Sequence, residues 1–166
     1  MTKTLFMETT RIPPMKTAGE ITELLVRAGA AQIAMEYRGQ KIVGLMFSVP
    51  APGRVEPYCY KLPVRVDPVF KLLNGRRPES NWSRGSRREW ADRDRDQSER
   101  VAWRQLLRWI QAQLAMIETG MAEILEVFLP YMQAQDGRTM FQLFHDHELK
   151  MLEAPEAAVL NGEGDR

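Results

Sequence analysis

The chain has 166 residues, 44% of them hydrophobic, with 23 basic and 22 acidic side chains and a formal net charge of +1. This length suits one domain with tails and excludes a second full domain. A charge so close to zero excludes a global field that would draw the protein to nucleic acid or to a membrane, so electrostatic binding has to be local.

The single cysteine, Cys59, excludes an intramolecular disulfide and a cysteine-only metal site. Free cysteine fits a reducing compartment, so we expect a cytoplasmic protein. No stretch approaches the roughly 18 to 20 apolar residues that cross a bilayer, and no membrane partner is expected. Residues 1–16 carry Lys3, Glu8 and Arg11 without a continuous apolar core, which predicts a mobile or loosely docked arm and not an export signal.

The first predicted helix begins at Thr17. Thr17 and Glu20 fit a capping box, in which each side chain accepts from a backbone amide at the helix start. Gly29 is well placed to end the helix. Four apolar residues between these points share one helix face: Ile21, Leu24, Leu25 and Ala28.

Two runs of alternating apolar side chains follow, at residues 33–37 and 43–49, with Gly39 between them. A period of two predicts β-strands, and the short break predicts a hairpin. A third strand is expected between Pro57 and Pro63. Because proline cannot donate to a strand ladder, this strand should be short and at an edge of the sheet.

A short helix is predicted after Asp67, because Asp67 suits an N-cap and Pro68 suits the first helical position. Asn74 and Gly75 would close it. A polar insert, residues 76–97, then separates this compact segment from the longest helix of the chain.

The long helix is predicted to begin at a second capping box, Asp96 and Glu99, and to continue through Gly120 to Pro130. Roughly 32 residues at a rise of 1.5 Å would span about 48 Å, so the helix either bends near Gly120 or protrudes. Its main apolar stripe, at 100° per residue, comprises Trp103, Leu106, Leu107, Ile110, Leu114, Ile117, Met121, Ile124, Leu125 and Phe128.

A second, weaker apolar stripe lies about 100° from the first on this helix. A helix that covers one small sheet needs a single apolar face, so the second stripe implies another buried contact. The chain's own N-terminal helix or C-terminal tail is one cover, and a helix of another subunit is the alternative. The candidate partner-binding residues of a homo-oligomer or adaptor protein are therefore Ala102, Trp109, Met116 and Val127.

Beyond Pro130, residues 140–144 fit either a strand or part of a short helix. Residues 154–166 are rich in glycine and acids and are predicted to be a disordered tail. The expected organisation is an arm (1–16), one domain (17–153) with the insert at 76–97, and the tail. The expected class is α+β, a small three-stranded antiparallel sheet packed with a short N-terminal helix and one long amphipathic C-terminal helix.

No catalytic motif is present: the chain has no glycine-rich phosphate loop, nucleophile elbow or zincin motif. His145 and His147 flank Asp146, but histidines two apart on a helix point to different faces, and on a strand they have no evident third ligand. Cys59 has no activating base beside it in the sequence and is predicted to be a core or half-exposed thiol. We therefore expect neither catalysis nor a metal or cofactor.

The insert is the one region that invites a functional interpretation. Guanidinium groups form paired hydrogen bonds to phosphate oxygens, and the planes of guanidinium and indole groups stack on unpaired bases. The insert is therefore predicted to be a loop that binds single-stranded or junction nucleic acid, either DNA or RNA. The alternative is a flexible, solvated linker whose acidic second half neutralises its basic first half. The candidate binding residues are Arg76, Arg77, Trp82, Arg84, Arg87, Arg88 and Trp90.

The order helix, three strands, helix resembles the double-stranded-RNA-binding fold, and a hairpin with a third strand under a long helix is similar to the annealing proteins of phage recombination. The first of these folds has a lysine cluster at the start of its final helix. This chain has Asp96, Gln97, Ser98, Glu99 and Arg100 there. That resemblance therefore does not supply a phosphate contact at this point.

A resemblance in sequence covers residues 98–132, SERVAWRQLLRWIQAQLAMIETGMAEILEVFLPYM. This segment resembles one in small uncharacterised proteins of phages and prophages. The resemblance carries no assigned activity and no known functional residues. It implies a mobile-element context, in which DNA handling, assembly and host interference are common tasks.

Overall fold

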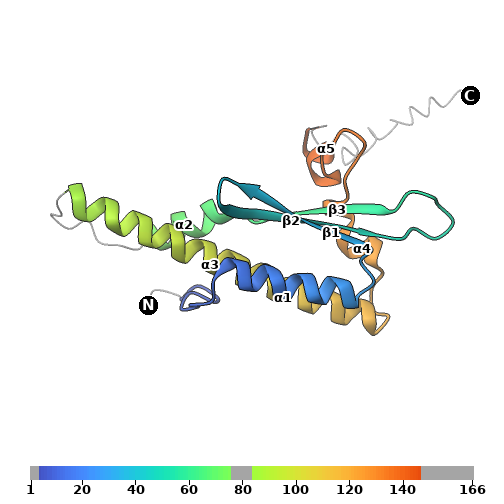
Figure 1. Cartoon of the computed structure of the whole chain (residues 1–166), viewed down its shortest axis with the longest axis horizontal. Coiled ribbons are helices and arrows are strands. Elements are labelled where there is room, and N and C mark those ends of the chain that lie inside the picture. Colours follow the sequence, from blue (N-terminus) through green and yellow to red (C-terminus); the bar gives the residue numbers. More distant parts are fainter. Residues whose placement is uncertain (1–3, 76–83, 147–166) are drawn as a thin grey trace, which may run out of the picture.

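A computed structural model of the protein describes residues 4–75 and 84–146. Helices α1 (Pro14–Arg27) and α3 (Arg84–Glu118) lie against one face of a three-stranded sheet, and α5 (Met140–Asp146) lies on the other side (Figure 1). The expected α+β class, with an N-terminal helix and a long C-terminal helix, is confirmed. The remaining elements are β1 (Gln32–Arg38), β2 (Lys41–Val49), β3 (Tyr58–Pro63), α2 (Val66–Asn74), α4 (Ile124–Phe128) and the 3-10 helix η1 (Leu129–Tyr131).

The sheet has the order β1-β2-β3, and both pairs of strands are antiparallel. The predicted hairpin and the predicted third strand at an edge are both confirmed. Between Glu36 and Tyr37 the register shifts by one residue, because Gly44 pairs with Glu36 while Ile42 pairs with Tyr37. The extra residue in β2 is a bulge, and it lets Ile42 and Leu45 both enter the core beneath the sheet.

Helix α1 begins at Pro14, so the predicted start at a Thr17 capping box is wrong. Proline suits the first helical position because its missing N–H would have no partner there. Thr17 instead lies buried inside the helix, and its backbone amide donates to the Pro13 carbonyl at 3.2 Å. Gly29 ends α1 as predicted, with a φ of 91° and its amide donating to Val26.

The segment before α1 lies along α3. The Gln97 side-chain amide donates to the backbone carbonyls of Glu8 and Thr10, at 2.7 and 2.8 Å, and the Gln105 amide donates to the Phe6 carbonyl at 2.9 Å. The described part of the predicted arm is thus hydrogen-bonded to the domain up to the start of α1.

Helix α2 begins at Val66 with Arg65 in the N-cap position, so the prediction that Asp67 caps this helix is wrong. Asp67 lies in the first turn, where a carboxylate is favoured by the positive end of the helix dipole. Gly75 closes the helix as predicted, and its amide donates to the Lys71 carbonyl at 3.0 Å.

Helix α3 begins at Arg84, so the part of the predicted insert from residue 84 to residue 97 is helical and not a loop. Asp96 and Glu99 do not cap it. Glu99 accepts a hydrogen bond from Lys41 Nζ at 2.6 Å, and Asp96 lies 3.6 Å from the same atom. Arg95 also pairs with Asp67 at 3.1 Å. Ion pairs thus join the early turns of α3 to the hairpin turn of the sheet and to the start of α2.

Helix α3 ends at Glu118, so the prediction of one continuous helix to Pro130 is wrong. Gly120 has a φ of 72°, which side chains with a Cβ rarely adopt. Its amide donates to the Ile117 carbonyl, and the Met121 amide donates to the Met116 carbonyl, which completes a glycine C-cap. The chain then starts the separate helix α4 at Ile124.

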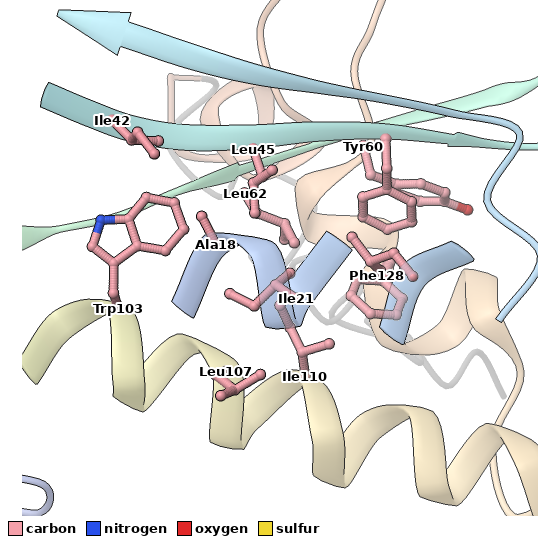
Figure 2. Packing of buried hydrophobic residues seen from close by; sticks show 12 residues of the cluster. Ala18, Ile21, Ile42, Leu45, Tyr60, Leu62, Trp103, Leu107, Ile110 and Phe128 are labelled. Carbon is pink, nitrogen blue, oxygen red and sulfur yellow. The ribbon is translucent and has the colours of Figure 1, made fainter. Parts of the chain in front are cut away.

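The core lies between the sheet and the helices α1, α3 and α4. Figure 2 shows Trp103 of α3 pointing toward Ile42 at one end and Phe128 of α4 lying beside Tyr60 at the other. The Phe128 ring stands edge-on to Phe47, with centroids 5.4 Å apart. The largest side chains that are fully removed from solvent are Trp103, Tyr60, Phe128, Ile21, Leu25, Leu45, Leu62, Leu107 and Ile110.

The chain after η1 turns back along β3. The Gln133 amide donates to the Cys59 carbonyl at 2.8 Å, and Met132 forms a bridge with Tyr60. Residues 140–144, for which strand and helix were both open, are helical and belong to α5. The Cys59 thiol is exposed, so the prediction of a core or half-exposed thiol is wrong. None of the described helices is long and apolar enough to span a membrane.

Candidate nucleic-acid interface

The predicted binding residues of the insert fall in three different settings. Arg76, Arg77 and Trp82 lie outside the described residues, and Arg84, Arg87 and Arg88 lie in the first turns of α3. Trp90 is half-buried, and the Arg93 guanidinium lies 5.2 Å from the centroid of its ring. The described half of the insert is therefore helical and not an open loop.

The predicted second stripe of the long helix is partly covered by the chain itself. Ala102 is buried in a small cluster with Val69 of α2. The Trp109 ring packs against Phe128 and Tyr131, with centroids 5.5 and 5.4 Å apart. These covering elements, α2, α4 and η1, are neither the N-terminal helix nor a C-terminal tail.

Of the four candidate partner-binding side chains, Met116 is exposed and the other three are buried or half-buried. Met116 lies near the end of α3 with 38% of its surface exposed. Val127 of α4 packs against the main core. The stripe as a whole is therefore not a continuous free surface.

A cleft of about 630 Å³ lies between the turn of the β1–β2 hairpin, the start of α2 and the first half of α3, and we name it the α2 cleft. Cations outnumber carboxylates along it. Its carboxylates are Glu36, Asp67 and Glu99, and its cations are Arg38, Lys41, Lys61, Arg65 and Arg95.

Three of these cations are held in ion pairs. Lys41 is bonded to Glu99, which raises the pKa of the lysine above its ordinary value, with nearby Asp96 adding to the effect. Lys61 pairs with Glu36 at 3.1 Å, and Arg95 pairs with Asp67. Such pairing leaves little net charge at these three points for an external anion.

Arg38 and Arg65 differ from these three. Both are exposed, and neither guanidinium has a carboxylate within 4.0 Å in residues 4–75 and 84–146. Arg38 ends β1, and Arg65 occupies the N-cap position of α2. The α2 cleft therefore has two uncompensated, accessible guanidinium groups.

A second cleft, of about 720 Å³, lies between the end of β3, α3 and α5, and we name it the α5 cleft. Three aromatic side chains line it, Trp109, Tyr131 and Phe141. Its cations are Lys61, Arg65 and Arg138, and its carboxylate is Asp136. Arg138 binds Asp136 at 2.7 Å and Asp146 at 3.0 Å, and the first of these bonds lowers the pKa of Asp136.

The two clefts meet at the end of β3. Lys61, Pro63, Val64 and Arg65 line both of them. The Arg65 guanidinium lies 5.7 Å from the centroid of the Phe141 ring, so it stands between the charged cleft and the aromatic cleft. A ligand that contacts Arg65 can reach into either cleft.

The first turns of α3 precede the residues of this helix that line the α2 cleft. Positions 84 and 88 precede Arg95, which lines the cleft, by about three and two helical turns. In an α-helix such positions fall along one line. Figure 1 shows this end of α3 reaching past the sheet with α2 beside it.

Sequence reasoning did not identify Arg38 or Arg65, because each stands alone in its local pattern. Arg38 precedes the glycine of a hairpin turn, and Arg65 precedes a helix. Folding brings them to one cleft from positions 27 apart in the chain. No local motif signals such a pairing.

Within residues 4–75 and 84–146, no group of three or more histidine, cysteine, aspartate or glutamate side chains is arranged to hold a metal ion. His145 is exposed beside Asp146, and His147 lies outside the described residues. No protein-family model, curated protein or solved structure matches this chain. The two clefts are therefore the features of the described residues that bear on function.

Proposed function

We propose that the protein binds nucleic acid without catalysing a reaction, and that the α2 cleft holds the phosphate backbone. The observation that carries this proposal is the pair of exposed guanidinium groups, Arg38 and Arg65, that have no carboxylate partner among the described residues. Guanidinium groups bind phosphate oxygens through two parallel hydrogen bonds, which suits them to this ligand.

The arginine-rich start of α3 supports the same proposal. Arg84 and Arg88 precede Arg95 on the helix, so a backbone lying in the α2 cleft would continue along α3 toward them. Arg87 shares these turns, and Arg76 and Arg77 precede them in the chain. The resemblance of residues 98–132 to phage and prophage proteins supports an accessory protein of a phage or mobile element.

A salt titration tests the proposal. A labelled 20-nucleotide strand is titrated with the protein at several salt concentrations, and affinity is read from fluorescence anisotropy. Arg38→Glu/Arg65→Glu should weaken binding about 10- to 100-fold and reduce the salt slope by about 1 to 2, because two phosphate contacts are lost.

The matched control is Lys16→Glu/Arg27→Glu, which makes the same change of charge at two exposed positions of α1 that line neither cleft. It should keep most of the affinity. A wild-type protein that ignores the strand at about 50 mM salt would refute nucleic-acid binding. A control as weak as the arginine variant would refute the assignment to the α2 cleft.

A further inference from the structure

We infer that the α5 cleft takes an unpaired nucleobase, so that the protein prefers single-stranded over double-stranded nucleic acid. This inference rests on the proposed function and adds a second, chemically different subsite to it. The α2 cleft would bind the charged phosphates, whereas the α5 cleft would bind the flat face of a base.

The aromatic lining of the α5 cleft comes from separate elements. Trp109 belongs to α3, Tyr131 to η1 and Phe141 to α5. The Trp109 ring packs against Phe128 and Tyr131, and 49% of the Phe141 surface is exposed to solvent. The exposed ring of Phe141 offers an aromatic face on which an unpaired base can stack.

The size of the cleft fits this ligand. Its volume of about 720 Å³ lies within the range of roughly 300 to 1,000 Å³ that encloses drug-sized molecules, and a nucleotide is of that size. A duplex could not use such a site, because its bases are stacked on one another and present only their edges and phosphates.

One cation of the α5 cleft is available to bind a phosphate. Arg138 is neutralised by Asp136 and Asp146, and Lys61 is neutralised by Glu36. Arg65 is left as the unpaired cation among the described residues that line this cleft, and it also lines the α2 cleft. A phosphate on Arg65 would therefore place its own base beside Phe141 while the neighbouring phosphates follow the α2 cleft.

The test compares one sequence as a single strand and as a blunt duplex, both labelled, with each variant. Phe141→Ala should weaken binding to the single strand by about 5- to 150-fold, the loss expected for one stacked base, and should leave duplex binding and the salt slope unchanged. Phe141→Tyr keeps an aromatic face and should retain most of the single-strand affinity.

Phe144→Ala is the matched control, because Phe144 is 42% exposed on the same short helix and lines neither cleft. Urea unfolding of each variant confirms that α5 still docks. If Phe141→Ala binds the single strand as tightly as wild type, or loses single strand and duplex equally, base stacking in the α5 cleft is wrong while nucleic-acid binding stands. If no variant and no wild-type protein binds either oligonucleotide, both proposals fail.

Discussion

Arg104 Nη1 donates a hydrogen bond to Glu20 Oε2 at 2.6 Å, and this ion pair joins α3 to α1 across 84 positions of the chain. The arginine side chain is 8% exposed, whereas the glutamate is 36% exposed. The buried partner depends on the accessible one, because an unpaired guanidinium away from water is costly. Glu20, which was predicted to belong to a capping box, instead forms an ion pair between α1 and α3.

Glu20→Ala should lower the free energy of unfolding by about 1 to 3 kcal/mol, since it leaves the Arg104 guanidinium without its charged acceptor. Urea unfolding at neutral pH measures this. Glu23→Ala, which breaks an exposed pair with Arg27 on the same helix, should cost less than about 0.5 kcal/mol. In an Arg104→Met background Glu20→Ala should cost little, and a full cost there would contradict the dependence on Arg104.

Gly44→Ala should destabilise the protein by about 1 to 3 kcal/mol through overpacking. A Cβ at position 44 would lie 3.1 Å from the Leu62 carbonyl oxygen and 3.3 Å from Glu36 Oε2. The carbonyl belongs to the backbone of the paired strand and cannot move aside freely.

The control for this prediction is Gly19→Ala in α1, where a Cβ would meet no atom within 4 Å. That change should stabilise the protein by about 0.5 to 1 kcal/mol, because alanine loses less backbone entropy in a helix than glycine. Thermal unfolding of both variants gives the comparison, and the same sign of effect at both positions would contradict it.

Phe128→Ala should lower the free energy of unfolding by about 3 to 5 kcal/mol. Phe128 is fully buried and contacts the rings of Phe47, Tyr60 and Trp109, so its removal opens a cavity where α4 meets the sheet. Leu129→Ala, at the next residue, should cost less than about 1 kcal/mol because that side chain is 46% exposed. Equal losses would mean that α4 is not docked through Phe128.

Tyr60→Phe should leave stability unchanged or slightly higher at neutral pH. The Tyr60 hydroxyl is buried and has no hydrogen-bond partner within the described part of the chain, so removing it also removes an unsatisfied polar group. Denaturant unfolding at pH 7 measures the difference, and a clear loss of stability would show that the hydroxyl has a partner after all.

The same variant carries a prediction about alkaline pH. Burial, and then the nearby Tyr58, raise the pKa of the Tyr60 hydroxyl above its ordinary value. The unfolded chain therefore loses this proton first, and the stability linked to it is present below about pH 10 and is lost as the pH rises toward the folded pKa. Between pH 7 and pH 11 wild type should lose more stability than Tyr60→Phe, while Tyr37→Phe at an exposed position should behave as wild type.

Local patterns were sufficient for the sheet and for the identity of the main helices. Alternating side chains at 33–37 and 43–49 predict strands because only a period of two places Leu45 and Phe47 on one buried face. The period of 3.6 at Trp103, Leu107 and Ile110 likewise predicts the buried face of α3. Gly120 also carried a local stop signal, which the continuing apolar stripe obscured.

The start of α3 and the candidate site depended on contacts between distant segments. Residues 84–97 read as a polar insert because their composition suits helix and solvated loop alike, and the acids predicted to cap the helix pair instead with Lys41 from the hairpin. Arg38 and Arg65 become one site only when the sheet, in the order β1-β2-β3, brings the end of β1 and the end of β3 to the same cleft. Side-chain periodicity predicts which face of a helix or strand is buried, because it depends on residues that are close in the sequence. It does not predict which charged side chains lack an ion-pair partner. Only the tertiary structure decides this, because the partners come from distant parts of the chain.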